Sequence, residues 1–113
     1  MKKEAFYRTL RGNGPGAREF LADNGYVYNL VTPGSPSIGF AIARTASGEW
    51  DITHISSGCR ACVKTYKTKK EALQQFSETD YICAVVRLSN CNQTKELEKE
   101  LNEYKQKQGD QKQ

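Results

Sequence analysis

The fold prediction rests on residues 49–76, EWDITHISSGCRACVKTYKTKKEALQQF. Within this stretch Trp50, Ile52 and His54 alternate with Asp51 and Thr53. A strict alternation of this kind is typical of a strand that buries one face and exposes the other. The sequence therefore predicts a strand that begins near residue 49 and places the tryptophan, isoleucine and histidine side chains on a shared face.

A turn, a second alternating run and a helix start follow this strand. Residues 56–58, Ser-Ser-Gly, have turn chemistry, and the alternation resumes over 59–66. Thr68 and Glu71 form a capping box, in which the threonine hydroxyl accepts the Glu71 amide and the carboxylate reaches back to the Thr68 amide. Apolar side chains at helical spacing come next, so a helix is predicted over 69–76.

The segments on either side complete an α+β fold with the element order β-β-β-α-β-α. Residues 37–66 are predicted to form a three-stranded antiparallel meander, because 38–42 also alternates. The near-continuous apolar run over 81–88 predicts a strand that is buried on both faces. We therefore expect an antiparallel sheet of three to four strands with helices packed on one face.

The chain is expected to form a single small domain over 1–108. Its last helix carries a narrow apolar stripe (Leu97, Leu101 and Tyr104), which either docks lightly on the domain or serves a partner. The N-terminal part, over 1–36, is expected to be irregular, with short helices at 2–10 and 17–21, a stop for the second helix at Asn24-Gly25 and a strand at 26–30. A sheet and helix core is expected over 37–88, followed by a charged helix over 92–107. The tail over 109–113 is expected to be disordered.

Composition and hydropathy bound the cellular context. No apolar run approaches the roughly 20 residues that a membrane span needs, and the N-terminal residues lack the apolar region of a signal peptide. We therefore expect a cytoplasmic protein that makes no contact with membranes. In a reducing cytoplasm the four cysteines indicate a metal site or buried thiols rather than disulfides.

Two cysteines have the spacing of a zinc knuckle. Cys59 and Cys62 are separated by two residues, so a tight turn could direct both thiolates at one ion. If the meander strands alternate in direction, the start of the 81–88 strand, near Cys83, lies at the same sheet edge as His54. The sequence therefore predicts one structural zinc at Cys59 and Cys62, completed by His54 and Cys83.

Two alternatives to this zinc site stay open. Cys91 could replace Cys83 or His54 as a ligand. The cysteines could also be plain buried thiols, because Cys59 and Cys62 would point to opposite faces if they belonged to a regular strand.

No catalytic set emerges from the residue types. A redox-active CxxC needs a helix N-terminus to lower the thiol pKa, whereas this one leads into a strand-like run. Asp51, His54 and Ser56 or Ser57 are triad residue types, but no nucleophile elbow surrounds them. With a single histidine and no paired carboxylates, the chain is predicted not to be an enzyme.

A basic group of residues is the candidate binding site. Residues 56–76 carry a local charge of +4, whereas 19–55 sum to −3. Basic side chains around an aromatic on a sheet face are what a phosphate backbone attracts, although a solvated basic face is the simpler alternative. The predicted binding residues are Arg60, Lys64, Tyr66, Lys67, Lys69 and Lys70.

Two family resemblances cover part of the chain. The pattern WxxTHxxSG at 50–58, followed by YKTKKEA at 66–72, resembles small uncharacterised proteins of phages and mobile elements. Three strands followed by this helix are also similar to the arm-type DNA-binding domain of tyrosine integrases. In that family the sheet face enters the major groove. This chain departs from the pattern in its CxxC and its acidic 49–51, and it lacks a recombinase catalytic domain. The matching positions would be Arg44, Arg60, Lys64 and Tyr66.

These resemblances imply that the chain acts by binding. The first hypothesis is a non-enzymatic inhibitor from a phage or mobile element, similar to anti-CRISPR proteins, whose partner is a host protein that handles nucleic acid. The alternative is a small DNA-binding accessory protein that uses the basic face of 60–66 and the start of the 69–76 helix, with nucleic acid itself as the partner. The net charge of +4 and the acidic 19–55 segment favour the inhibitor.

Overall fold

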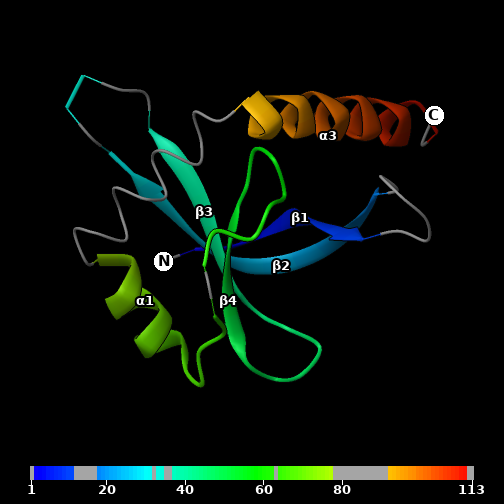
Figure 1. The fold of residues 1–113 in the computed structure, drawn as a ribbon. Coiled ribbons are helices and arrows are strands. Elements are labelled where there is room, and N and C mark those ends of the chain that lie inside the picture. Colours follow the sequence, from blue (N-terminus) through cyan, green and yellow to red (C-terminus); the bar gives the residue numbers. More distant parts are fainter. Residues whose placement is uncertain are drawn as a thin grey trace.

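The computed structural model describes residues 2–11, 18–31, 33–34, 37–62, 64–77 and 92–111. These residues form an antiparallel four-stranded sheet in the order β1-β2-β3-β4, and two helices pack against it (Figure 1). The α+β prediction is therefore confirmed. The elements are β1 (Lys3–Arg11), β2 (Arg18–Leu30), β3 (Ile38–Arg44), β4 (Trp50–His54), α1 (Lys69–Ser77) and α3 (Asn92–Gln111).

The β3–β4 hairpin forms as the alternation predicts. Phe40 pairs with His54 and Ile42 pairs with Ile52, and all four side chains are buried. Because cross-strand partners project from the same face, these residues define what we call the helix face of the sheet. From α1, the Phe76 ring packs 4.9 Å from the Phe40 ring, so the helix covers this face.

The start of α1 follows the predicted capping box in one of its two bonds. The Glu71 amide donates to the Thr68 hydroxyl at 3.1 Å. The Glu71 carboxylate, however, accepts from the amide of Lys67 at 3.3 Å rather than from Thr68. The first bond satisfies an amide that the first helical turn leaves without a partner, and the second satisfies the amide of the residue just before the N-cap.

The helices predicted over 2–10 and 17–21 are wrong, since residues 3–10 lie in β1 and residues 18–21 lie in β2. β1 pairs with the first half of β2, from Lys3 opposite Tyr26 to Arg11 opposite Arg18. Short segments with few apolar residues match either periodicity, and here the backbone pairing between the two segments decides. The irregular part predicted over 1–36 is thus largely a long hairpin.

Gly25 lies inside β2 and does not stop a helix. Residues 18–26 of this strand pair with β1, and 26–30 pair with β3. The hairpin of β1 and β2 consequently crosses the β3–β4 hairpin (Figure 1). A Cβ at Gly25 would lie 2.9 Å from the Ala43 Cβ and 2.9 Å from the Phe6 ring. Only glycine allows the two layers to approach this closely.

The two edges of the sheet meet beyond β4. The Thr9 amide of β1 donates to the Gly58 carbonyl at 2.8 Å, and the Thr9 hydroxyl donates to the Ser57 carbonyl at 2.9 Å. Gly58 has a φ of 74°, as the turn predicted at 56–58 requires. The sheet therefore curls into a partly closed barrel in which β1 covers the face opposite the helices.

The third meander strand, predicted over 59–66, is replaced by two isolated bridges to β4. Thr53 pairs with Arg60 and Trp50 pairs with Tyr66. Between these two bridges the chain advances by six residues from Arg60 to Tyr66, but by only three along β4 from Trp50 to Thr53. The extra residues bulge out of the ladder. Within the bulge, the buried Cys62 thiol accepts a hydrogen bond from the Ile52 amide at 3.4 Å. It takes the place of a backbone carbonyl.

The C-terminal helix is longer than predicted. α3 includes residues 109–111, which the sequence assigns to a disordered tail, while 112–113 lie outside the described residues. In the described part of the chain neither helix is long and apolar enough to cross a membrane. The strand predicted over 81–88 also lies outside the described residues.

The apolar stripe of α3 packs on the chain's own sheet. Leu97 and Leu101 are buried, and the Tyr104 ring lies 5.6 Å from the Tyr7 ring and 5.4 Å from the Phe20 ring. Of the two predicted roles, the stripe therefore takes the first, docking on the domain.

Candidate nucleic-acid interface

Three aromatic side chains form a row on the helix face of the sheet. Tyr26 comes from β2 and Trp50 from the start of β4, with ring centroids 6.2 Å apart. Tyr66 joins them because its backbone pairs with that of Trp50 in both directions, at 2.6 and 2.7 Å. The Tyr66 residue is only 5% exposed, so Tyr26 and Trp50 are the two rings of the row that are partly accessible. Strand register alone brings these three rings together, since the residues are widely separated in the sequence.

A basic side chain lies over each ring of this row. Lys69 Nζ, at the start of α1, is 4.0 Å from the Tyr26 ring centroid. Arg44 Cζ, at the end of β3, is 5.5 Å from the Trp50 ring. Lys64 Nζ, in the bulge, is 5.8 Å from the Tyr66 ring. We call the six residues Tyr26, Arg44, Trp50, Lys64, Tyr66 and Lys69 the aromatic–basic surface.

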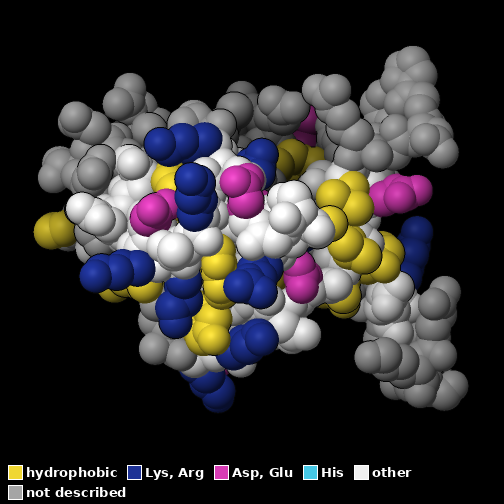
Figure 2. All heavy atoms as spheres, turned by 90° about the horizontal axis from the view of Figure 1, so that it is seen from below, with side chains coloured by type: hydrophobic (Ala, Val, Ile, Leu, Met, Phe, Trp, Pro, Cys, Tyr) yellow, Lys and Arg dark blue, Asp and Glu magenta, His cyan; other side chains and the backbone are white. Residues whose placement is uncertain are grey.

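The carboxylates next to the aromatic–basic surface are engaged in local bonds. Glu49 accepts a hydrogen bond from the Thr65 hydroxyl, and Glu71 accepts from the Lys67 amide. In the view of Figure 2, basic side chains surround a central strip of hydrophobic side chains, and several acidic side chains lie among them. The local field on this side therefore favours an anionic ligand.

A groove lies beside Trp50 where β2 separates from β3. Tyr26 opposite Ile42 is the last residue pair between these strands, and beyond it they diverge. The opening has a volume of about 400 Å³. Its lining includes Lys3, Asn24, Tyr26, Arg44 and Trp50, so the groove continues the aromatic–basic surface.

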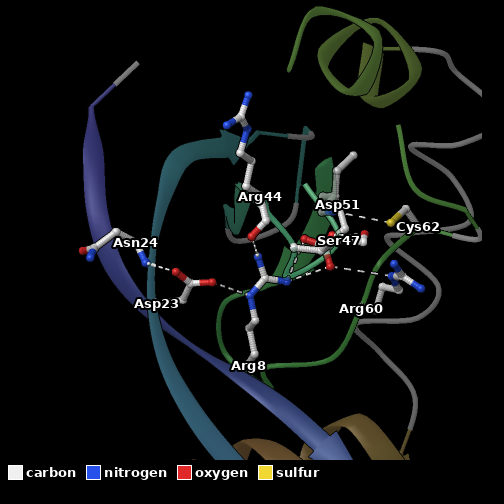
Figure 3. A network of polar contacts seen from close by, with 10 residues as sticks. Arg8, Asp23, Asn24, Arg44, Ser47, Asp51, Arg60 and Cys62 are labelled. Carbon is white, nitrogen blue, oxygen red and sulfur yellow. Dashed lines mark hydrogen bonds and ion pairs between the residues drawn. The ribbon is translucent and has the colours of Figure 1, made fainter. Parts of the chain in front are cut away.

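On the face opposite the helices, Arg8 of β1 contacts residues of the three other strands (Figure 3). Its Nε donates to Asp23 at 2.8 Å, its Nη1 donates to both Asp51 carboxylate oxygens at 2.7 Å, and its Nη2 donates to the Arg44 carbonyl at 3.1 Å. The side chains of Arg8 and Asp51 are 11% and 7% exposed. This network joins the edge strand β1 to β4 and holds the curled sheet closed.

The predicted binding residues do not all lie on the aromatic–basic surface. Lys64, Tyr66 and Lys69 belong to the aromatic–basic surface. Arg60 lies instead on the opposite face, with its Nε 3.7 Å from Asp51, and lines a pocket of about 440 Å³ together with Arg8. The remaining two, Lys67 and Lys70, are exposed near the start of α1.

The predicted metal ligands are only partly described. Cys59 and Cys62 are free cysteines, and burial raises the pKa of the Cys62 thiol. Within the described ranges, no group of three or more His, Cys, Asp or Glu side chains is placed to hold a metal ion. Cys83 and Cys91 lie outside the described residues, so the structural zinc stays a prediction.

His54 is buried between the sheet and α3. Its Nδ1 lies 2.7 Å from the Ser57 hydroxyl, which accepts a hydrogen bond from the Cys59 amide at 3.2 Å. On the other side of the ring, Nε2 lies 3.9 Å from a Glu98 carboxylate oxygen. Ser57 is 0% exposed, so this pair is not placed to attack a substrate.

The pKa of His54 is lowered from its ordinary value of 6.5 because burial disfavours the imidazolium. The unfolded chain therefore binds the proton more tightly than the folded chain does. We expect stability to be fully present above pH 6.5 and to fall as the pH decreases below that value. The measurement is urea denaturation between pH 5 and 7.5, compared with the His54→Gln variant.

His54 is the only histidine in the chain, so the variant removes all histidine titration. The difference between the two unfolding profiles isolates its contribution from that of the carboxylates. Identical pH profiles for the two proteins would contradict the prediction.

Sequence reasoning missed Tyr26 and Trp50 as binding residues and found Arg44 only through the integrase resemblance. Trp50 packs against the core cluster from a half-buried position. Its alternation with Asp51 signals a shared face, but nothing in the sequence indicates which strand lies beside it. Arg8 and Asp51 are 43 residues apart, so no local sequence pattern predicts that they form an ion pair.

No protein-family model matches the chain, and neither a curated protein nor a solved structure is significantly similar to it.

Proposed function

We propose that the protein binds nucleic acid through the aromatic–basic surface. The observation that carries this proposal is the set of cation–aromatic pairs: Lys69 with Tyr26, Arg44 with Trp50, and Lys64 with Tyr66. Nucleic acids present phosphate charge and flat apolar bases together, and surfaces that bind them combine basic with aromatic side chains. A basic patch that serves only for solubility does not need the rings.

Two features that favoured a protein-binding inhibitor in the sequence have other roles in the structure. The acidic 19–55 segment includes Asp23 and Asp51, whose charges are paired with Arg8, and Glu49, which bonds Thr65. The apolar stripe of α3 packs against Tyr7 and other residues of the sheet. Support for nucleic-acid binding is therefore greater, and the inhibitor hypothesis stays a prediction.

The test measures how binding depends on salt and on charge. Fluorescence anisotropy of a labelled mixed-sequence oligonucleotide, as a single strand and as a duplex, is followed from low to physiological ionic strength. We expect log K to fall linearly with log salt, with a slope of about −0.7 to −0.9 for each phosphate contact. The double variant Lys64→Glu/Lys69→Glu should lower the magnitude of the slope by about 2 and weaken binding to every sequence alike.

The matched control is Lys95→Glu/Lys99→Glu, which changes the same total charge at exposed positions of α3. We expect the control to bind more tightly than the Lys64→Glu/Lys69→Glu variant. Equal losses in both double variants would contradict binding at the aromatic–basic surface. Negligible binding of both oligonucleotides, with one dominant protein recovered from a host lysate, would overturn the proposal in favour of the inhibitor.

A further inference from the structure

We infer that the nucleic acid bound at the aromatic–basic surface is single-stranded, with one unpaired base stacked on Trp50 in the neighbouring groove. This inference rests on the proposed function and names the class of nucleic acid. It concerns stacking on the faces of the rings, whereas the salt and charge-reversal test of the proposed function measures the contribution of the charges.

Duplex and single-stranded nucleic acids expose different parts of their bases. In a duplex the base faces are covered by neighbouring base pairs, so a protein ring can reach them only after a base leaves the stack. In a single strand every base offers a face for stacking, whatever its sequence. A row of aromatic rings is therefore useful to a single strand and of little use to an intact duplex.

The two partly accessible rings of the row are placed as neighbouring platforms. Tyr26 and Trp50 are half-buried, and their ring planes are tilted by 35°. Lys69 lies over one ring and Arg44 over the other, so a base that stacks on either ring takes the place of the long, flexible cationic side chain above it. Successive bases can stack near successive rings while the cations meet the phosphates between them.

The groove beside Trp50 provides space for an inserted base. Its volume of about 400 Å³ is within the range of small-ligand sites, about 300–1,000 Å³. Asn24 at its rim carries an exposed amide, which can both donate to and accept from a base edge. Lys3 and Arg44 also line the groove and supply positive charge for the flanking phosphates, whereas Asp23, the carboxylate in this lining, is paired with Arg8.

The chain contains a single tryptophan, so its fluorescence reports directly on Trp50. Purified full-length protein is titrated with oligothymidine, with a duplex of equal length, and with an abasic sugar-phosphate oligomer of equal length. We expect oligothymidine to quench the fluorescence and to bind about ten- to a hundredfold more tightly than the abasic oligomer, as expected for one stacked base. The duplex should bind more weakly than oligothymidine and leave the fluorescence nearly unchanged.

Variants locate the stacking. By anisotropy with labelled oligothymidine, Trp50→Ala should weaken binding about ten- to a hundredfold, and Trp50→Phe should retain most of the affinity. Neither change should alter binding of the abasic oligomer. If Trp50→Ala fails to fold, as judged by circular dichroism, Tyr26→Leu is the second variant. It should weaken binding of oligothymidine and leave binding of the abasic oligomer unchanged.

The outcomes separate this inference from the proposed function. If oligothymidine, duplex and abasic oligomer bind alike with the same salt dependence, stacking is excluded while nucleic-acid binding stands. Preferential binding of the duplex without quenching also overturns the inference alone. If none of the three binds, the inference and the proposed function fail together.

Discussion

Replacing Asp51 with alanine is expected to lower the free energy of unfolding by about 3–5 kcal/mol. Asp51 accepts two hydrogen bonds from the Arg8 guanidinium, and both side chains are nearly buried. Removing the carboxylate leaves a cation inside the curled sheet without its principal counter-charge. Because β1 and β4 are opposite edges of the sheet, the loss also weakens its closure. Urea denaturation followed by circular dichroism measures the change.

Asp23→Ala is the matched control for this prediction. Asp23 also pairs with Arg8, but its side chain is 36% exposed and water can replace part of the interaction. We expect its removal to cost about 1 kcal/mol or less. The double variant Arg8→Met/Asp51→Leu should be more stable than Asp51→Ala, since it removes both buried charges together. A loss below about 1 kcal/mol for Asp51→Ala would contradict the prediction.

Replacing Phe76 with alanine should cost about 3–5 kcal/mol, the range for removing a buried phenylalanine. Phe76 is 1% exposed, and its ring packs edge to face against Tyr28 at 4.6 Å and Phe40 at 4.9 Å. The substitution leaves a cavity between α1 and the sheet that these two rings cannot close. Thermal and urea unfolding measure the loss.

Gln74→Ala serves as the control on the same helix. Gln74 is exposed, so its replacement should change stability by no more than about 0.5 kcal/mol. A loss of less than about 1 kcal/mol for Phe76→Ala would show that α1 does not depend on this contact for docking. Because α1 carries Lys69, the Phe76→Ala variant should also bind nucleic acid less tightly if the helix detaches.

Part of the fold could be predicted because its signals are local. The alternation of 38–42 and 50–54 matches the period of a strand, and Thr68 provides an N-cap immediately before α1. The β3–β4 hairpin, α1 and most of α3 follow from such patterns. Within the site, Lys64, Tyr66 and Lys69 were found because they are close neighbours in the sequence.

The tertiary structure decided the features that depend on distant partners. Residues 3–11 and 18–26 are strands because they pair with each other, although neither segment has enough apolar residues to favour one periodicity. The bulge after Arg60 interrupts an alternation that looks regular, since the Cys62 thiol replaces a carbonyl in the ladder. Arg8 and Asp51 meet only because the sheet curls, which requires close packing at Gly25.

The sequence by itself therefore determined the α+β class, the β3–β4 hairpin, both helices and the basic residues near α1. Only the tertiary structure decided that Tyr26 and Trp50 lie side by side with Lys69 and Arg44 over their rings. The physical reason is that the apolar periodicity of a strand or a helix depends on residues that are close together in the sequence. The register between strands, and the burial of the Arg8 charge, depend instead on which distant segments share a core.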